Sequence, residues 1–311
     1  MKILFWGTSE FAIPSLRALK AEGHYIVGVV TRPDRPAGRG RQVRPSAMKI
    51  EASESSIRIL EPEFPDSEDF VEEIRDLSPD ISVVVAYGRI LKRKVLEAPT
   101  EGSINLHASL LPRLRGAAPI NWSIARGDRV SGVTVIRMVE KMDAGPIIFQ
   151  IEEPIEPDET ATNLGIRLSE IGAVALVKTL TLMEMGAIEE RKQDESAVTY
   201  APKLDRATAR IDWSLPSTAI ADIIRGMDAL PGAWSELSGS PLKLFRPKIE
   251  SEMIPEVSPG VVVAADPAMG LLVATGEGVI RIGEVQPPGK HRMDAGAWIL
   301  GRGTSTGQRF E

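Results

Sequence analysis

Residues 103–116 read SINLHASLLPRLRG, a short apolar strand that ends in a polar pair and a sharp turn. Because side chains alternate along a strand, Ile104 and Leu106 are expected on one face and Asn105 and His107 on the other. An amide can donate to a developing oxyanion, and an imidazole can manage the proton of an attacking nucleophile. The pair therefore fits an acyl-transfer centre. On its own it favours a simpler role, with Asn105 satisfying a turn and His107 a loop carbonyl, so the rest of the chain has to decide.

The first half of the chain alternates short apolar strands with helical patterns, which is typical of a parallel α/β sheet. The apolar run Ile81–Ala86 is the kind of strand that is buried on both faces. The turn at residues 7–12, GTSEFA, has one glycine rather than the three of a dinucleotide fingerprint, so we expect no NAD. Further strands are expected at residues 3–6, 26–31, 104–107, 133–138 and 147–151, and helices at 12–22 and 160–185.

The pattern changes after residue 188. Mixed charges and Pro202 predict a linker over residues 189–206. Beyond it, a short helix at 217–227 is followed by small β segments separated by Gly and Pro, which predicts a small barrel or sandwich. These segments are expected at residues 233–237, 242–245, 260–264, 271–274 and 279–282. We therefore expect two domains, residues 1–188 and 207–311.

Composition narrows the function classes. A chain of 311 residues with 43% hydrophobic and 26% charged residues is ordinary for a globular protein. No apolar run approaches the roughly 20 residues of a membrane-spanning helix, and the first residues predict a strand, so we expect a cytoplasmic protein, by default a monomer. The absence of cysteine excludes disulfides and a thiol nucleophile, and with only three histidines no metal site is expected. A net charge of −6 argues against coating of a polyanion but allows a local basic patch.

Such a patch occurs in residues 31–45, where five arginines are opposed only by Asp34. Pro and Gly disfavour regular structure there, while arginine offers paired donors to phosphates and stacking surfaces for bases. A solvated loop paired with nearby carboxylates is the alternative. The shortage of counter-charges favours nucleic-acid binding by Arg32, Arg35, Arg39, Arg41 and Arg44.

A carboxylate, Asp143, lies in the turn EKMDAGP at residues 140–146. Because the ends of parallel strands gather at one edge of a sheet, we expect Asp143 close to His107. There it could orient the imidazole and stabilise its protonated form. Taken alone, a turn aspartate more simply caps its own turn. Combined with Asn105 and His107, it completes an amide–imidazole–carboxylate set.

At this point the chain resembles a family, the 10-formyltetrahydrofolate-dependent formyltransferases. The motifs that carry the resemblance are NLHASLLP at residues 105–112, RGAAPI at 115–120 and MDAG at 142–145. The Arg32–Arg41 segment resembles members that act on a tRNA, and so do VTYAPKL at 198–204, ARIDW at 209–213 and QPPGK at 286–290. Leu114 departs from the aromatic residue usual in the family, which puts a stacking role at that position in doubt.

The resemblance implies a Rossmann-like formyltransferase domain followed by a small OB-like β-barrel domain that contacts tRNA. It implies that the formyl group of 10-formyltetrahydrofolate passes to the α-amino group of methionine on initiator tRNA, a step of translation initiation. Asn105 would donate to the oxyanion. His107 would accept or relay the amine proton, or stabilise the oxyanion when protonated. Asp143 would hold His107 in place.

The resemblance also implies binding residues. Folate is expected along two stretches, namely Tyr87, Gly88, Arg89, Ile90 and Leu91, and Ser109, Leu110, Leu111 and Pro112. For tRNA it adds a local face of the second domain to the arginine-rich segment: Lys243, Arg246, Lys248, Lys290 and Arg292. Two alternatives stay open. A formyltransferase for a small amine, such as a glycinamide ribonucleotide or an aminosugar nucleotide, would need neither the arginines nor the second domain. A non-catalytic tRNA- or folate-binding protein would have no need of Asp143.

Overall fold

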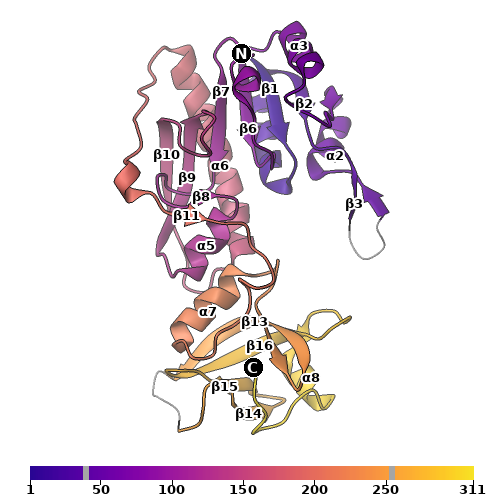
Figure 1. Cartoon of the computed structure of the whole chain (residues 1–311), viewed down its shortest axis with the longest axis vertical. Coiled ribbons are helices and arrows are strands. Elements are labelled where there is room, and N and C mark those ends of the chain that lie inside the picture. The colour runs from indigo at the N-terminus through magenta and orange to yellow at the C-terminus, as the bar shows by residue number, and fades with distance from the viewer. Residues whose placement is uncertain (38–41, 252–255) are drawn as a thin grey trace. The chain divides into compact units, whose positions relative to one another are not determined.

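The chain divides into two compact units (Figure 1). The computed structural model describes residues 1–37, 42–251 and 256–311. The first unit comprises Met1–Pro119, Val130–Pro154 and Gly165–Ala201, and the second comprises Ile120–Arg129, Ile155–Leu164 and Pro202–Glu311. The second unit thus takes in two short segments, residues 120–129 and 155–164, that precede the expected linker.

A seven-stranded sheet forms the centre of the first unit, in the order β10-β9-β7-β6-β1-β2-β5. Its strands are β1 (Lys2–Gly7), β2 (Tyr25–Val30), β5 (Ile59–Leu60), β6 (Ile81–Val85), β7 (Ser103–His107), β9 (Val130–Arg137) and β10 (Ile147–Pro154). The five strands from β5 to β7 are parallel, and β6 is buried at every position, as its apolar run predicted.

The expectation of a parallel sheet is wrong for β9 and β10. β9 runs antiparallel to β7, and β10 runs antiparallel to β9. A parallel neighbour needs a crossover connection across the sheet, usually a helix, whereas an antiparallel neighbour does not. The connection between β7 and β9 carries only the short strand β8 (Arg115–Gly116) and the helix α5 (Pro119–Ala125).

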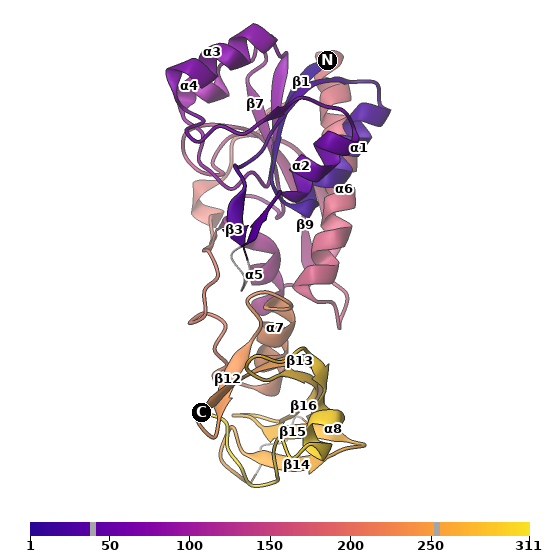
Figure 2. The same ribbon diagram turned by 90° about the vertical axis from the view of Figure 1, so that its right-hand side faces the viewer.

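Helices cover both faces of this sheet (Figure 2). On one face, Phe70, Val71 and Ile74 of α3 (Glu68–Leu77) share a core with Trp6 of β1 and with α4 (Arg93–Leu96). On the other lie α1 (Ile13–Ala21), α2 (Ala47–Glu54) and α6 (Ala161–Glu184). A Cβ atom on Gly172 of α6 would lie 2.5 Å from Leu106, so this helix lies directly on β7. That contact shows that Leu106 lies on the face of β7 that packs against α6.

The second unit is a curled antiparallel sheet in the order β12-β13-β16-β15-β14, which agrees with the expected small barrel. Its elements are α7 (Ser217–Gly226), β12 (Trp234–Leu237), β13 (Ser240–Ser251), β14 (Val262–Asp266), β15 (Gly270–Ala274), β16 (Val279–Gln286), β17 (Met293–Asp294) and α8 (Ala295–Leu300). The last residues bridge both edges, because Phe310 pairs with Leu237 of β12 and Arg309 pairs with Val261 beside β14.

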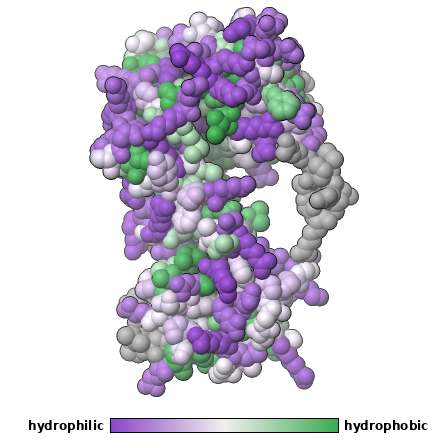
Figure 3. All heavy atoms as spheres, in the orientation of Figure 1, coloured by the Kyte–Doolittle hydropathy of each residue, from purple (hydrophilic) through white to green (hydrophobic). Residues whose placement is uncertain are grey.

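Two small pairings complete the first unit. β8 runs parallel to β11 (Tyr200–Ala201), and β3 (Arg35–Ala37) forms a hairpin with β4 (Gln42–Arg44) within the arginine-rich segment. On the face seen in Figure 3, the surface of each unit is mostly hydrophilic, with scattered apolar side chains. Among the described helices, none is both long and apolar enough to span a membrane.

Candidate active site

Asn105 and His107 lie at the carboxyl end of β7. Leu106 contacts α6, so the two polar side chains face away from that helix, as the strand alternation predicted. His107 is buried, with 6% of its surface exposed, and Asn105 is half-buried. No hydrogen bond joins the side-chain amide of Asn105 to any residue that the structure describes. This amide therefore has donors free for a ligand.

Both ring nitrogens of His107 face oxygen atoms. Nε2 lies 3.0 Å from the carbonyl oxygen of Leu114, and because a carbonyl only accepts, Nε2 carries a hydrogen and donates it. Nδ1 lies 3.7 Å from Oδ2 of Asp143, beyond a hydrogen bond but within ion-pair distance when the ring is charged. The same Oδ2 accepts a 2.9 Å hydrogen bond from the backbone N–H of Gly116. A protonated imidazole would thus have an acceptor on each side.

Asp143 reaches His107 by a route that differs from the predicted one. β9 is antiparallel to β7, so its last residue, Arg137, pairs with Ile104 at the opposite end of β7 from His107. The turn after β9 brings Asp143 back, with the left-handed φ of 53° at Asp143 itself. The expected proximity occurs, but the reason given for it, the gathering of parallel strand ends, is wrong.

The sequence did not predict the groups that hold the loop after β7 and the loop after β9. Gly116 has a φ of 129°, and a Cβ atom there would lie 2.5 Å from the carbonyl oxygen of Ala201, so only glycine fits between β8 and β11. Arg115 is 1% exposed and donates to Gln193 and Glu195. Hydrogen bonds from Arg115, then from Lys141, hold the pKa of the Glu195 carboxyl at about 2. The one sequence signal for this set was the RG pair at 115–116.

The residues predicted to bind folate lie in two loops. In the first, Gly88 and the neighbouring Ala86 are exposed and have positive φ values of 80° and 48°, and Ile90 is 73% exposed. Leu91 is buried in the core beside α3 and α4, and Arg89 donates to the carbonyl oxygen of Glu63.

The second loop is held against β9. Thr134 donates to the carbonyl oxygen of Ser109 at 2.6 Å and accepts from the backbone N–H of Leu111 at 3.1 Å. Leu111 is buried, whereas Leu110 and Pro112 are half-buried. Ser109 is 1% exposed, and its hydroxyl donates to the carbonyl oxygen of Arg113. The loop thus offers its backbone and two half-buried apolar side chains.

Tyr87 belongs to the core rather than to the surface of the first loop. Its side chain is 1% exposed and meets Trp6 edge to face, with ring centroids 5.2 Å apart. Burial raises the pKa of its phenol. Its backbone carbonyl accepts a hydrogen bond from Thr8 at 3.0 Å. Any contribution of Tyr87 to a ligand site at this loop would therefore come through its backbone.

The arginine-rich segment is tied together at its base. Asp34 is its single acidic residue, and the Oδ2 of Asp34 lies 2.7 Å from Nζ of Lys49, which also lies 2.8 Å from Glu61. Hydrogen bonds to these two carboxylates raise the pKa of Lys49. Arg32 lies beside Gly88, and Arg44 is exposed. Arg35 lies in β3, while the predicted contacts Arg39 and Arg41 fall outside the described residues.

The cations predicted on the second unit differ in their partners. Lys243, Arg246 and Lys248 all lie on β13, and Lys290 follows β16. Lys243 donates to the carbonyl oxygen of Pro231, and Arg246 pairs with Glu284 at 3.0 Å. Lys248 and Lys290 are exposed. Arg292 stacks over Phe245 at 4.0 Å and pairs with Asp228 and Glu284.

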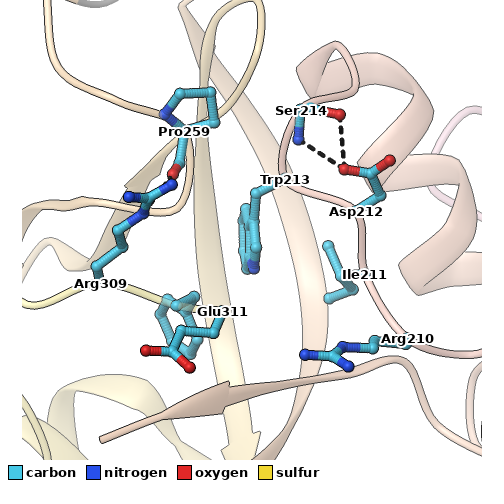
Figure 4. A pocket seen from close by; sticks show the side chains of 9 residues that line it. Arg210, Ile211, Asp212, Trp213, Ser214, Pro259, Arg309 and Glu311 are labelled. Carbon is cyan, nitrogen blue, oxygen red and sulfur yellow. Dashed lines mark hydrogen bonds between the residues drawn. The ribbon is translucent and has the colours of Figure 1, made fainter.

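The second unit also has a pocket of about 440 Å³ (Figure 4). Its walls include Arg210, Trp213 and Arg309, and Asp212 turns toward Ser214, which donates to it from both its N–H and its hydroxyl. This pocket shares no residue with the Asn105–His107–Asp143 set. Within residues 1–37, 42–251 and 256–311, no group of three or more His, Asp or Glu side chains is placed to hold a metal ion.

The fold and the site together indicate an acyl-transferring enzyme of the α/β class with an additional β unit. The family model described as "Formyl transferase" matches residues 1–180, and the one described as "Formyl transferase, C-terminal domain" matches residues 203–303. The chain belongs to the formyl transferase family.

Curated relatives agree with this assignment, and solved structures share the fold. The chain is 43% identical over 310 residues to methionyl-tRNA formyltransferase of Symbiobacterium thermophilum, covering 100% of this chain and 95% of the relative. It is 42% identical to the protein of that name from Chromobacterium violaceum, covering 100% and 99%. The fold resembles that of WlaRD, a sugar 3N-formyl transferase, with a TM-score of 0.67, 21% identity and coverage of 94% and 99%. It also resembles HypX from Aquifex aeolicus in complex with tetrahydrofolic acid, with a TM-score of 0.66, 20% identity and coverage of 97% and 47%.

Proposed function

We propose that this chain transfers the formyl group of 10-formyltetrahydrofolate to the α-amino group of methionine on initiator tRNA. The observation that carries the proposal is the convergence of Asn105, His107 and Asp143 at the end of β7, in a chain whose full-length relatives are named methionyl-tRNA formyltransferase. The free side-chain amide of Asn105 and the exposed residues Ala86 and Gly88 fit a folate donor.

The residues have distinct proposed tasks. The amine nitrogen attacks the formyl carbon, and the Asn105 amide donates to the oxygen that gains charge. The bond from that carbon to N10 of the donor then breaks, the amine gives up a proton and N10 takes one up. Nε2 of His107 is already occupied by Leu114, so Nδ1 is the nitrogen that exchanges a proton. Asp143, 3.7 Å away, stabilises that proton on the ring.

Replacing the proposed oxyanion donor tests this scheme. We expect Asn105→Ala to lower kcat about 10²- to 10³-fold, because a preorganised donor to the oxyanion is lost. Asp143→Asn should lower kcat while the Michaelis constants for folate and tRNA change little. Both are measured with charged initiator tRNA, on variants whose circular dichroism matches the wild type. Near-normal turnover in either folded variant would contradict the assigned roles.

Salt dependence separates tRNA from a small amine as acceptor. Phosphate contacts release counterions, so the Michaelis constant for initiator tRNA should rise steeply between about 50 and 200 mM salt. The Michaelis constant for folate serves as the control and should change little. A flat response for the acceptor would favour a small amine such as an aminosugar nucleotide. Faster formylation of charged elongator than of charged initiator tRNA would contradict the proposed selectivity.

We also propose that the enzyme works as a monomer in the cytoplasm, where translation initiation uses its product. All three proposed catalytic residues come from one chain and lie in one unit, so the set needs no residue from a second copy. Light scattering behind gel filtration should therefore give the mass of one chain. A dimer that stays intact at working enzyme concentration would contradict this.

A further inference from the structure

The segment from Gln193 to Ala201, which lies within the linker predicted from the sequence, supports both the loop after β7 and the loop that carries Asp143. Thr199 accepts from the backbone N–H of Leu114 at 2.9 Å, through its hydroxyl, and from that of Arg115 at 2.9 Å, through its carbonyl. Leu114 is the residue whose carbonyl accepts from Nε2 of His107. Thr199 therefore holds the backbone N–H groups on both sides of that carbonyl.

Gln193 supports the other loop. Its Nε2 donates to the carbonyl oxygens of Asp143 and Gly145, both at 2.8 Å. Its Oε1 accepts from Nε and Nη2 of Arg115, at 3.0 and 2.7 Å. One amide thus joins the loop of Asp143 to the residue next to Leu114. Through these bonds the two acceptors that face His107 become parts of one network.

The turn at Asp143 needs support from outside. Asp143 has a left-handed φ of 53°, which a non-glycine residue adopts only at a cost in free energy. Gly145 passes so close to the carbonyl of Arg137 that a Cβ atom there would lie 1.7 Å from its oxygen. The two Gln193 bonds are made to these two residues. Arg115 is 1% exposed and paired with Glu195, so it holds the side-chain amide of Gln193 in place.

We propose that Gln193 is a positioning residue: it holds the backbone of Asp143 so that the carboxylate stays opposite Nδ1 of His107. Gln193 acts through Asp143, and among the described residues its side-chain hydrogen bonds go to backbone carbonyls and to Arg115 rather than to the side chains of Asn105, His107 or Asp143. The inference rests on the proposed function, because it assigns Gln193 to that same site. It gives the connecting segment a part in catalysis in addition to joining the units.

Two substitutions separate positioning from mere packing. Gln193→Met removes every hydrogen bond of the amide at similar size. Gln193→Glu keeps an oxygen for Arg115 but loses both donors to the Asp143 loop. We expect each to lower kcat about 10- to 100-fold with both Michaelis constants within about twofold of the wild type, because a catalytic group is displaced without loss of ligand contacts. A folded Gln193→Glu enzyme with wild-type kcat would overturn the proposal.

The matched control is Asp194→Ala. Asp194 is exposed and is the next residue in the same segment, and among the described residues its side chain bonds only to Ser196. We expect its kcat to stay within about twofold of the wild type. An equal loss in Asp194→Ala and Gln193→Met would mean that the whole segment matters rather than the Gln193 amide, and would count against the proposal.

A double-substitution cycle tests whether Gln193 acts through Asp143. If it does, Gln193→Met should cost little further kcat in an Asp143→Asn background. Full additivity would overturn the inference. Nitrogen chemical shifts of the His107 ring give a second readout, which should change in Gln193→Met and not in Asp194→Ala. Failure of the proposed function itself looks different, because the wild-type enzyme would then not formylate charged initiator tRNA.

Discussion

Leu114 and Gly116 are two residues apart, and their backbones bond to two different proposed catalytic residues. The Leu114 carbonyl accepts from His107, and the Gly116 N–H donates to Asp143. The Leu114 side chain is 4% exposed. Position 114 therefore contributes through its backbone, and holding His107 does not require the aromatic residue usual in the family.

Gly116→Ala tests how closely β8 must approach β11. The added Cβ would lie 2.5 Å from the carbonyl oxygen of Ala201, at a φ that disfavours side chains. We expect a loss of about 2–4 kcal/mol in the free energy of unfolding, from strain and overpacking together. We also expect a lower kcat, because the N–H that meets Asp143 must shift. Urea unfolding and steady-state formylation measure the two effects.

Gly186→Ala is the matched control for this substitution. Gly186 has a φ of 64°, and no atom lies within 4 Å of the place that an added Cβ would take, so the alanine adds backbone strain without a clash. We expect it to cost about 1 kcal/mol with kcat unchanged. Equal losses of stability in Gly116→Ala and Gly186→Ala would contradict the importance of the β8–β11 contact.

At the level of elements, local properties were predictable from the sequence and chain direction was not. The alternation in β7 predicted the shared face of Asn105 and His107, because side-chain period is a property of the strand itself. The direction of β9 was missed, since an apolar strand has the same pattern whether its neighbour is parallel or antiparallel. β13 runs to Ser251 rather than Phe245, because the register of its pairing with β16 continues past Arg246 and shifts only between Ile249 and Ser251.

The β3–β4 hairpin is held at its base by side chains from both of its ends. Thr31 and Ser46 share a 2.8 Å hydrogen bond, and Lys49 joins Asp34 to Glu61. Lys49→Met should therefore loosen the segment that carries the proposed tRNA-binding arginines. Holding a loop's ends together reduces the conformational entropy that binding must overcome.

We expect Lys49→Met to raise the Michaelis constant for initiator tRNA about 3- to 10-fold, with kcat and the Michaelis constant for folate unchanged. Initial rates over a range of tRNA concentrations measure this. Lys20→Met, which removes an exposed lysine from the end of α1, is the control for loss of one positive charge. If both substitutions raise the constant equally, net charge rather than the hairpin base is responsible.

For the whole molecule, the sequence predicted two parts but not how the chain is divided between them. The change from helical patterns to short β segments marked the second domain, and the linker composition marked the connection. What Gln193 and Thr199 contact was not predictable, because a polar linker carries no signal for the loops against which it packs. The inclusion of residues 120–129 and 155–164 in the second unit was also missed, since their periodicity is ordinary for an α/β domain.

No single cut in the chain separates the two units, because the chain passes from one unit to the other five times. Gly226 of α7 lies against Ala125, so closely that a Cβ atom would be 2.7 Å away, and Asn121 donates to its carbonyl oxygen at 2.7 Å. We therefore expect a fragment of residues 202–311 to be unstable without these partners. Dispersed amide resonances and cooperative unfolding of that fragment would contradict this.

The bridges made by the last residues bear on solubility. Without them, β12 and β14 would each present a row of unpaired backbone groups, the kind of surface on which a second chain can add a strand. Phe310 and Glu311 occupy that position beside β12, and Gly307 and Gln308 occupy it beside Val262 of β14. Loss of this segment should consequently appear first as concentration-dependent self-association, before any effect on the chemistry at His107.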